Sequence, residues 1–563
     1  MNRTPVMLAL AGALFLGAFS NAGAAPRISR IVNNASYIPD GVPGSGIGLG
    51  SIFAIFGEEM GPAQLKLADY PLPTSFEGTS LRISVGGAEV SAFLVYTSAT
   101  QVAAILPSNA APGRAVARLT YNGQTSEPFA FTIVRNGPGL FTLNSAGSGP
   151  AVLTDANFAV LTWTKPAQPG QAVIAWATGV NPLGSPDNER PPAFDPQLAV
   201  EIFVGGKLAN VRYRGRAPGF AGLDQLVFDI PDGVSGCSVS LVVRVGGNTS
   251  NFTTIPVAAP GKTVCSDANG FNESELSSIP AGGVRFGSIN FTRSRSKLTV
   301  PVVGSVESTN DIASASFYRL EGALFERSQG LAQASFGSCS VYTFQGESSS
   351  GDPIRVIPLD AGVSLTLTGS GGSRTMNKQN DGYFAMLGSE TSIPGGLPGG
   401  GLPGGGLPGG GQPLFLNPGE ITVTGPGGRD IGAFTARIVL PPAFNWTNQD
   451  SITEVQRAQD LTITWNGGNP SQDFVIVSGA SIRRNPTAGA SFVCVGPSSA
   501  GRLVVPSIVL SALPASEVVQ GTATGSLFVF NGPLSNVNRF TASGLDIGFI
   551  TYGNSSLKSL AYQ

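Results

Sequence analysis

A repeated layout constrains the fold of this chain more than any other feature of the sequence. The stretch from Val85 to Val134 is followed by a second copy of its layout from Val204 to Val257. A repeat of this length is a whole domain, because solenoid units are only about 20–50 residues long. The sequence therefore predicts a series of domains, of which this pair is the clearest part.

Three landmarks connect the two copies. Gly86-Gly87 matches Gly205-Gly206, Pro107 matches Pro231, and the turn at residues 123–126 matches the turn at residues 247–250. After the last landmark of the first copy, Phe129, Phe131 and Ile133 alternate with smaller or polar residues, which is the period of a strand with one buried face. Asn122-Gly123 is a strong hairpin signal. These patterns predict an all-β fold with several β-sandwich domains in series.

Composition excludes several classes of partner and reaction. Charged residues are 12% of the chain and the formal net charge is −2, so there is no electrostatic footprint for nucleic acid or for an anionic membrane surface. The chain has no histidine, which removes imidazole metal sites and histidine bases. Carboxylate pairs, lysine bases, and cysteine or carboxylate metal sites remain as catalytic options. We assign no cofactor and no metal.

The first 24 residues have the layout of a secretory signal peptide. Arg3 supplies the positive region, an apolar run extends from Val6 to Phe19, and Ala22-Gly23-Ala24 offers small residues before a cut after Ala24. The run is too short for a membrane span, and no later stretch is long and apolar enough for one. We therefore expect an exported protein, secreted or periplasmic, without a membrane span.

Six short segments resemble the tandem IPT/TIG-like, immunoglobulin-like β-sandwich domains of secreted acidobacterial proteins. They are Ile31–Tyr37, Pro71–Ser75, Ser98–Val102, Gly137–Phe141, Ala177–Gly179 and Ala217–Gln225. The resemblance covers somewhat under half of the chain and implies immunoglobulin-like sandwiches and export, but no activity and no catalytic residues. It also favours a bacterial source, in which the seven N-x-[ST] sequons after the expected signal peptide are simply polar turn residues rather than glycosylation sites.

These patterns divide the chain into six parts. We predict a signal peptide at 1–24, immunoglobulin-like domains at 28–135 and 136–258, a linker at 259–285, and β-sandwich domains at 286–435 and 436–563. The first C-terminal domain carries a Gly/Pro-rich loop at 394–413, which we interpret as internal to that domain. Pro506 to Leu513 predicts a short helix, because Pro suits a first turn and Pro514 would end it.

Motifs of nucleophilic and cofactor chemistry are weak in this chain. Ser294/Lys297 and Ser555/Lys558 fit the S-x-x-K pattern of serine acyl-enzymes, but neither is accompanied by the other motifs of those enzymes. The G-x-G-x-x-G match at 399–404 lies in a low-complexity repeat without strand–helix context. We therefore assign no catalytic and no cofactor-binding residues.

Two side-chain sets leave a functional alternative open. Most of the sparse acids fall in turns or linkers, where solvated loop charge is the simpler interpretation; examples are Asp187, Glu189, Asp195, Asp267 and Glu275. A carboxylate pair, as in glycosidases, meets in space rather than in sequence and so stays possible. The four tryptophans, Trp163, Trp176, Trp446 and Trp465, could form a sugar-stacking platform, although apolar strand runs around Trp176 and Trp465 favour core packing.

Four cysteines in an exported chain favour disulfides, and three pairings are possible. Cys237 opens a strand of the second domain and Cys265 follows that domain's last strand, so we pair them, which closes a loop that stabilises by roughly 3 kcal/mol. Cys339–Cys494 then follows by elimination.

The sequence favours a secreted, non-enzymatic binding, adhesion or structural protein that contacts polysaccharide, matrix or another surface protein. The alternative is an extracellular carbohydrate-active enzyme that uses a carboxylate pair in its C-terminal half.

Overall fold

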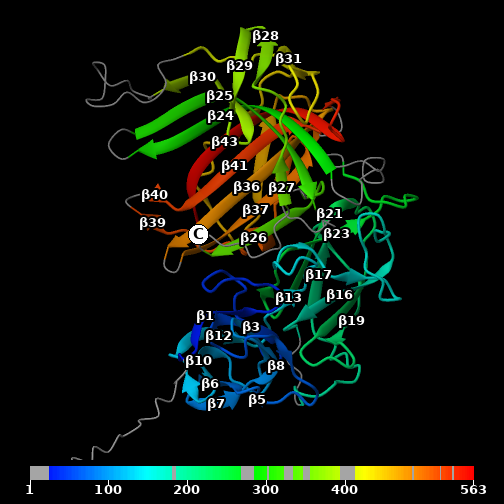
Figure 1. Cartoon of the computed structure of the whole chain (residues 1–563), viewed down its shortest axis with the longest axis vertical. Helices are drawn as coiled ribbons and strands as arrows, with labels where there is room; N and C mark the ends of the chain where they lie inside the picture. Colours follow the sequence, from blue (N-terminus) through cyan, green and yellow to red (C-terminus); the bar gives the residue numbers. More distant parts are fainter. Residues whose placement is uncertain are drawn as a thin grey trace, which may run out of the picture.

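The computed structural model describes residues 24–180, 186–267, 284–300, 304–321, 334–345, 355–392, 412–484, 487–519, 522–534 and 538–563. The expected signal peptide and almost all of the Gly/Pro-rich loop lie outside these residues. The described part is nearly all β, with one short helix, α2 (Ser507–Leu510), and one 3-10 turn, η2 (Ser498–Ala500). No described helix has the length and apolar character that crossing a membrane requires. Figure 1 shows the two N-terminal units, in blue and cyan to green, below the C-terminal half.

The first unit is a sandwich of two sheets. Its strands are β1 (Arg27–Asn33), β2 (Ile47–Gly48), β3 (Ile52–Glu58), β4 (Lys66–Leu67), β5 (Ser75–Phe76), β6 (Thr79–Val85), β7 (Ala88–Ser91), β8 (Phe93–Thr97), β9 (Gln101–Ile105), β10 (Gly113–Tyr121), β11 (Gln124–Thr125) and β12 (Phe129–Val134). One sheet has the order β1-β3-β9-β8-β4 and the other β2-β12-β10-β6-β5. Taken in chain order, these are the A-B-E-D and G-F-C arrangements of an immunoglobulin-like domain.

The second unit repeats this topology. Its strands are β13 (Gly139–Leu140), β14 (Gly149–Pro150), β15 (Leu153–Thr154), β16 (Ala172–Thr178), β17 (Val200–Val204), β18 (Lys207–Leu208), β19 (Val211–Arg216), β20 (Asp224–Asp229), β21 (Gly236–Val245), β22 (Asn248–Thr249) and β23 (Thr253–Val257). The orders β13-β16-β20-β19 and β14-β23-β21-β17-β18 again give A-B-E-D facing G-F-C. The predicted tandem of immunoglobulin-like sandwiches is confirmed.

The matched turns of the sequence repeat occupy equivalent places in the two units. Gly86-Gly87 joins β6 to β7, and Gly205-Gly206 joins β17 to β18. All four glycines have positive φ, between 56° and 84°, which other residues rarely adopt. The turns at residues 123–126 and 247–250 also match. Ser126 Oγ accepts the backbone N–H of Leu119, and Ser250 Oγ accepts that of Val243, both at 3.0 Å. The repeat therefore extends to individual hydrogen bonds.

The C-terminal half contains the largest sheet of the described structure. Its strands are β24 (Val284–Val300), β25 (Gly304–Glu321), β26 (Cys339–Gln345), β27 (Arg355–Pro358), β28 (Ser364–Gly369), β29 (Gly372–Gln379), β30 (Gly382–Ser392), β31 (Gly419–Gly425), β32 (Phe434–Leu440), β33 (Asn445–Trp446), β34 (Glu454–Val455), β35 (Leu461–Asn466), β36 (Asp473–Arg484), β37 (Thr487–Pro497), β38 (Arg502–Val505), β39 (Val518–Val519), β40 (Thr522–Ala523), β41 (Gly525–Pro533), β42 (Arg539–Phe540) and β43 (Ile547–Tyr562). The main path runs β26-β37-β36-β41-β43-β24-β25-β30-β29-β28-β31-β32.

Two apolar cores lie along this sheet. One is built mainly by residues 289–440 and the other mainly by residues 444–562. The border expected at 435/436 falls inside β32, whose Ala436, Ile438 and Leu440 still belong to the first core, and strands on each side of it contribute to the other core. β26 pairs with β37 and contributes Val341 to the second core, while β43 pairs in parallel with β24 and contributes Ile550 to the first. The ranges 286–435 and 436–563 therefore share one sheet.

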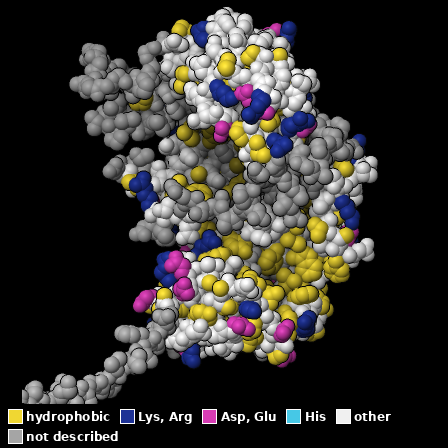
Figure 2. All heavy atoms as spheres, viewed as in Figure 1, with side chains coloured by type: hydrophobic (Ala, Val, Ile, Leu, Met, Phe, Trp, Pro, Cys, Tyr) yellow, Lys and Arg dark blue, Asp and Glu magenta, His cyan; other side chains and the backbone are white. Residues whose placement is uncertain are grey.

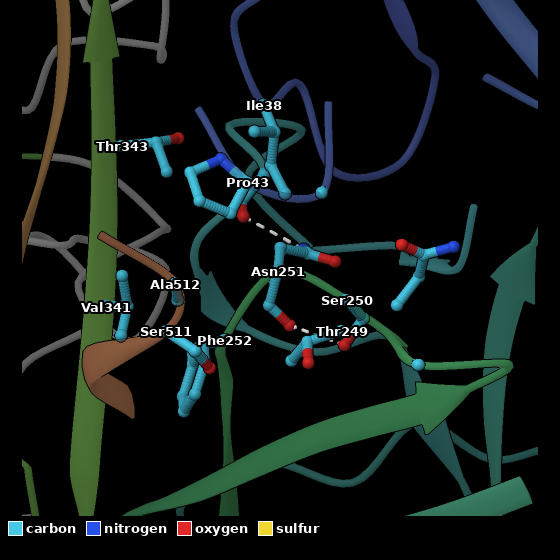
Figure 3. A pocket seen from close by; sticks show the side chains of 14 residues that line it. Ile38, Pro43, Thr249, Ser250, Asn251, Phe252, Val341, Thr343, Ser511 and Ala512 are labelled. Carbon is cyan, nitrogen blue, oxygen red and sulfur yellow. Dashed lines mark hydrogen bonds between the residues drawn. The ribbon is translucent and has the colours of Figure 1, made fainter. Parts of the chain in front are cut away.

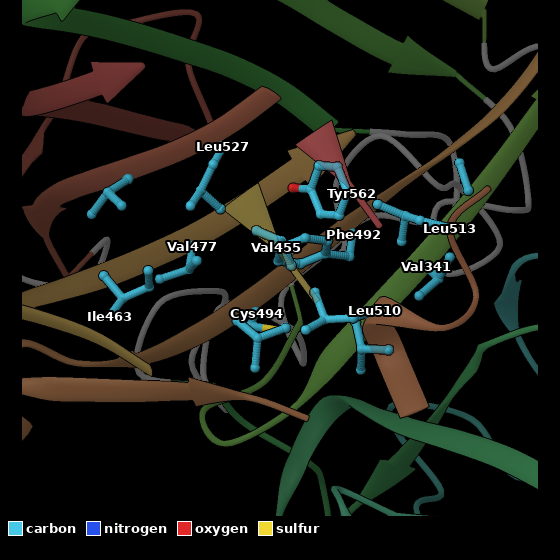
Figure 4. Packing of buried hydrophobic residues seen from close by; sticks show 14 of the residues in the cluster. Val341, Val455, Ile463, Val477, Phe492, Cys494, Leu510, Leu513, Leu527 and Tyr562 are labelled. Atoms are coloured by element: carbon cyan, nitrogen blue, oxygen red, sulfur yellow. The ribbon is translucent and has the colours of Figure 1, made fainter. Parts of the chain in front are cut away.

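Both disulfides in the described structure join the cysteines that the sequence pairs. Cys237 at the start of β21 is bonded to Cys265, and Cys339 of β26 is bonded to Cys494 of β37. Figure 4 shows Cys494 among the buried residues of the second core. The helix expected between Pro506 and Leu513 is confirmed in part, since α2 begins after Pro506 and ends at Leu510.

The second C-terminal core extends into both N-terminal units. Ile38 and Val42 of the first unit and Val242 and Phe252 of the second belong to the same buried cluster as Phe492 of β37. Arg483 also donates a hydrogen bond to the carbonyl oxygen of Gly41 at 3.1 Å. The three parts therefore meet at one junction, and the chain is not a row of separated modules.

Candidate binding site

The two S-x-x-K matches lie side by side, but their geometry does not suit catalysis. β24 and β43 pair in parallel with Ser294 beside Ser555 and Lys297 beside Lys558. In a strand, residues three apart point to opposite faces of the sheet, so each serine faces away from its lysine. Lys297 forms ion pairs with Glu307 at 2.9 Å and Asp450 at 3.1 Å. Lys297 thus links β24 to β25 and to the segment that follows β33.

Two neighbouring carboxylates, Asp360 and Asp430, lie in two loops that contact each other through backbone hydrogen bonds. Asp360 accepts backbone N–H bonds and an ammonium bond from Lys378, which lower its pKa to about 2. The side chain of Arg429 lowers the pKa of Asp430. A glycosidase needs one carboxylic acid with a raised pKa beside a second carboxylate. This pair does not have that property, because both members favour the ionised form.

The acids expected in solvated loops have different surroundings. Asp187 Oδ2 accepts the N–H of Ser108 at 2.6 Å, and Asp195 lies 3.6 Å from Arg214. The expectation is wrong for Asp267, whose carboxylate accepts the N–H of Cys237 at 2.8 Å and whose pKa is raised by burial. It fastens the segment after Cys265 to β21. Glu275 lies outside the described residues.

Three of the four tryptophans pack in the interior. Trp163, Trp446 and Trp465 are 5–6% exposed, which agrees with core packing rather than a platform. Trp176 differs, because the core of its domain is filled by its neighbours Ala175 and Ala177 while Trp176 lies half-buried on the other face of β16. The core interpretation of Trp176 is therefore wrong. It fails because β16 is apolar on both faces, so the sequence does not show which face is inside.

Two pockets at the junction of the three parts share Phe252. The larger has a volume of about 260 Å³ and lies between the second unit and the C-terminal half. Phe203 and Val242 line one wall, while Leu503 and Ile508 line the opposite wall. The disulfide Cys339–Cys494 also borders it. The pocket is thus mostly apolar and lies at a domain interface, which is a preferred location of ligand sites.

One ion pair stands at the rim of the larger pocket. Arg244 donates two hydrogen bonds to Glu201, from Nε at 2.6 Å and from Nη2 at 2.7 Å, and its guanidinium lies 5.4 Å from the ring centre of Phe203. The hydrogen bond from Arg244 lowers the pKa of Glu201, and the bond to Glu201 raises the pKa of Arg244. The rim therefore offers no unpaired charge from this pair. Hydroxyl groups of Ser240, Ser338 and Ser507 are the small polar groups of the lining.

The smaller pocket has a volume of about 120 Å³ and a more polar wall. Figure 3 shows Ile38 and Pro43 from the first unit, Thr249 to Phe252 from the second, and Val341, Thr343, Ser511 and Ala512 from the C-terminal half. Asn251 is fixed by its own unit, since its amide donates to the carbonyl oxygens of Leu140 and Gly147, both at 2.9 Å. No residue of this lining carries a charge. The arrangement can hold an uncharged group, and it has no acid or base for chemistry.

The described residues contain no group of three or more acids and cysteines placed to hold a metal ion. Sequence reasoning missed the junction pockets entirely. Their walls come from segments far apart in the chain, such as Phe203 and Leu503, and no local pattern marks such a meeting.

Comparison with known proteins identifies no family. No family model matches the chain, and no curated protein matches it. Among solved structures, the plexin A4 extracellular region is 14% identical, with 41% of this chain and 18% of that chain covered and a TM-score of 0.16. Sidekick-1 immunoglobulin domains 1–4 are 12% identical, with 91% and 99% covered and a TM-score of 0.11. SGBP-B from the mixed-linkage glucan utilization locus of Bacteroides ovatus is 11% identical, with 82% and 84% covered and a TM-score of 0.12.

Proposed function

We propose that this protein is an exported, non-enzymatic binding protein that acts at or outside the cell surface. The observation that carries the proposal is an apolar pocket of about 260 Å³ between the second unit and the C-terminal half, with paired charges at its rim. Ligand sites are concave, mostly apolar and furnished with a few polar groups, and this pocket has that character. An uncharged, partly apolar ligand matches it best.

The proposed compartment rests on sulfur chemistry. Two disulfides, Cys237–Cys265 and Cys339–Cys494, require an oxidising environment to form and persist. The expected signal peptide and the IPT/TIG-like segments support export from a bacterial cell. We infer that the mature protein begins near Ala25 and stays outside the cytoplasm.

The test of binding without turnover uses the purified mature protein, residues 25–563. It is applied to a glycan and matrix-protein array and, separately, to a hydrolase screen over polysaccharide, ester and peptide substrates. We expect retention on the array and no product in the screen. Turnover that disappears when a single Asp or Glu is changed to its amide, with folding intact, would overturn the non-enzymatic proposal.

The junction pocket is tested by filling it. Val504 lines the pocket and is 43% exposed, so Val504→Trp places an indole at its mouth without disturbing a fully buried side chain. In a thermal-shift screen of small uncharged compounds, a compound that raises the Tm of the wild type should lose its effect on this variant. Leu67→Trp, at a 69% exposed position in β4 of the first unit and away from the lining, is the matched control and should behave as the wild type.

A further inference from the structure

Trp176 stands on the outer face of the second unit. Val173, Ala175 and Ala177 alternate with it along β16 and fill the core, so the indole points away from that core. Its Nε1–H donates to Thr154 Oγ1 at 3.3 Å, which fixes the ring orientation. The side chain is half-buried, and one partner covers part of it. That partner is Phe158.

Phe158 is presented to solvent in an unfavourable backbone conformation. Its side chain is 60% exposed, and its ring centre lies 6.1 Å from that of Trp176. Its φ is +62°, a left-handed value that is a genuine outlier for a bulky residue. Such strain persists only where the surroundings impose it, and it clusters at functional sites.

The loop that imposes this conformation is closed by Asp155. Asp155 Oδ1 accepts the N–H groups of Asn157 and Ala159, both at 2.9 Å, and its backbone carbonyl accepts the N–H of Phe158 at 3.0 Å. Lys165 Nζ lies 3.4 Å from Asp155 Oδ2. The loop therefore holds the Phe158 ring in place before any ligand arrives, and it balances its own charge.

The same face continues across the sheet as a row. Trp176 pairs with Gln225 of β20, and Gln225 pairs with Gly215 of β19. Gly215 has no side chain, and a Cβ there would lie 1.9 Å from the carbonyl oxygen of Phe194, so the Phe194 backbone lies over it. Phe194 is itself 51% exposed. We call Phe158, Trp176, Gln225 and Phe194 the aromatic row; at about 4.8 Å between strands, its three strands span about 10 Å.

Apolar side chains also gather on one face of the two N-terminal units. Figure 2 shows apolar side chains gathered over the two N-terminal units, in the area of β8, β16 and β19. Charges beside the row are paired, since Arg214 lies 3.6 Å from Asp195 just as Lys165 lies by Asp155. The face therefore combines flat rings with amide and hydroxyl groups and carries no unpaired charge from these four residues.

We propose that the aromatic row binds a neutral polysaccharide chain, which deepens and rests on the proposed binding function. Sugar rings present apolar C–H faces that stack on aromatic faces, while their hydroxyl groups need donors and acceptors such as Gln225 and Asn157. Paired charges match an uncharged polymer and give no attraction for uronate or phosphate groups. A rigid sheet and a preformed loop reduce the ordering cost of binding.

The experiment is affinity gel electrophoresis of the mature protein in gels that contain hydroxyethyl cellulose, galactomannan or arabinoxylan, with alginate as the anionic comparison. We expect at least one neutral polymer to retard the wild type and alginate to have no effect. Phe158→Ala should weaken that retardation at least tenfold. Leu208→Ala, which removes an equally exposed side chain from β18 in the opposite sheet, should leave it unchanged.

A second variant and two further measurements distinguish polysaccharide binding from misfolding and from self-association. Phe158→Leu keeps apolar bulk without a ring, so it should also lose binding, and circular dichroism should show both variants folded. Retardation by alginate alone, retardation unaffected by either variant, or no retardation by any neutral polymer would overturn the inference. So would self-association in sedimentation velocity that depends on Phe158, because the row would then be a contact between copies of this chain. Ligand binding that is blocked by Val504→Trp would preserve the broader proposal in each of these cases.

Discussion

Cys339 and Cys494 lie directly opposite each other in the ladder between β26 and β37, 155 residues apart in sequence and 4.1 Å apart at Cα. The bond joins β26, whose neighbours in sequence build the first C-terminal core, to a strand of the second core. It also borders the larger junction pocket. One covalent bond thus secures both the register of the sheet and a wall of the candidate site.

Removing this bond should be the most costly cysteine change. A closed loop of this length is worth about 5 kcal/mol in the chain-entropy model, against about 3.5 kcal/mol for the loop closed by Cys237–Cys265. We expect the double variant Cys339→Ala/Cys494→Ala to lose more stability in guanidinium unfolding than Cys237→Ala/Cys265→Ala. An equal or smaller loss would show that β26 is held mainly by its hydrogen bonds and packing.

Arg216 and Asp224 form a buried ion pair in the second unit. Their side chains are 5% and 0% exposed, with Nη1 to Oδ1 at 3.1 Å, and Asp224 Oδ2 accepts the N–H of Val180 at 2.8 Å. Arg216→Met leaves the carboxylate buried without its cation, which typically costs about 3–5 kcal/mol. Arg216→Met/Asp224→Leu should recover part of that loss in urea unfolding. If the single variant is as stable as the wild type, the pair does not contribute in the way its burial implies.

Ser126 and Ser250 offer a matched test of the domain repeat. Each hydroxyl accepts a buried backbone N–H at 3.0 Å, and each serine's own N–H is bonded to the carbonyl of the same partner residue at 2.8 Å. Ser→Ala at either site leaves that donor unsatisfied, which costs about 1–3 kcal/mol. We expect similar losses for the two variants, measured by chemical unfolding. A loss at one site alone would mean that the two units do not depend on this hydrogen bond equally.

Asp473 should make stability depend on pH. It is 2% exposed, accepts hydrogen bonds from the Tyr552 hydroxyl and from the N–H of Asn469, and burial raises its pKa. The folded protein therefore holds this proton more tightly than the unfolded chain does. The resulting stability is complete below the ordinary pKa of Asp and is lost as the pH rises through the raised value. Asp473→Asn should flatten this part of the curve in urea unfolding between pH 4 and 8.

A control variant separates charge from packing at this site. Tyr552→Phe removes a hydroxyl donor that stabilises the ionised carboxylate, so it should cost about 1–3 kcal/mol at neutral pH. It should also steepen the decline of stability with pH. A pH profile identical to that of the wild type in both variants would contradict the role given to Asp473.

The Gly/Pro-rich segment is predicted to be an internal loop, and its described flanks can be examined. Ser389 of β30 donates its N–H to the carbonyl of Gln412 at 3.1 Å, and Asp311 Oδ2 accepts the N–H groups of Phe415 and Leu416 at 2.7 and 2.8 Å. Both ends are thus fastened to one sheet. Deleting residues 399–410 should change the Tm by only a few degrees. Independent folding of fragments 286–394 and 413–563 would favour a linker instead.

The sequence was informative wherever a local pattern carries the structure. Gly86-Gly87 and Gly205-Gly206 predicted equivalent turns, and alternation in Phe129–Val134 predicted a strand with one buried face. The inward face of β16 was not predictable, because Ile174 and Trp176 on one face are as apolar as Val173, Ala175 and Ala177 on the other. The positive φ of Phe158 was not predictable from the sequence either. Asp155-Ala156-Asn157 indicates only an ordinary turn, whereas the exposure of the Phe158 ring depends on the hydrogen bonds that Asp155 accepts in the folded loop.

The remaining features of the fold could not be predicted from the sequence because they depend on pairing between distant segments. The shared C-terminal sheet depends on β24 beside β43, which are about 260 residues apart, and on β26 beside β37. A local pattern predicts that a segment is a strand and which of its faces is apolar, but not which strand it pairs with. The junction pockets could not be predicted for the same reason, since Phe252 and Ile508 meet only when the units pack.

The parallel pairing of β24 with β43 imposes an order on biogenesis. As the chain emerges from the ribosome or from an export channel, the β24–β25 hairpin can form early, but the other edge of β24 must wait for residues 547–562. An unpaired edge of this length is a template for association with other chains. Contacts so distant in sequence also form slowly. A chain stopped before residue 547 should therefore be aggregation-prone and should depend on holding chaperones, whereas the two N-terminal sandwiches, each closed by its own strands, can fold as soon as they are made.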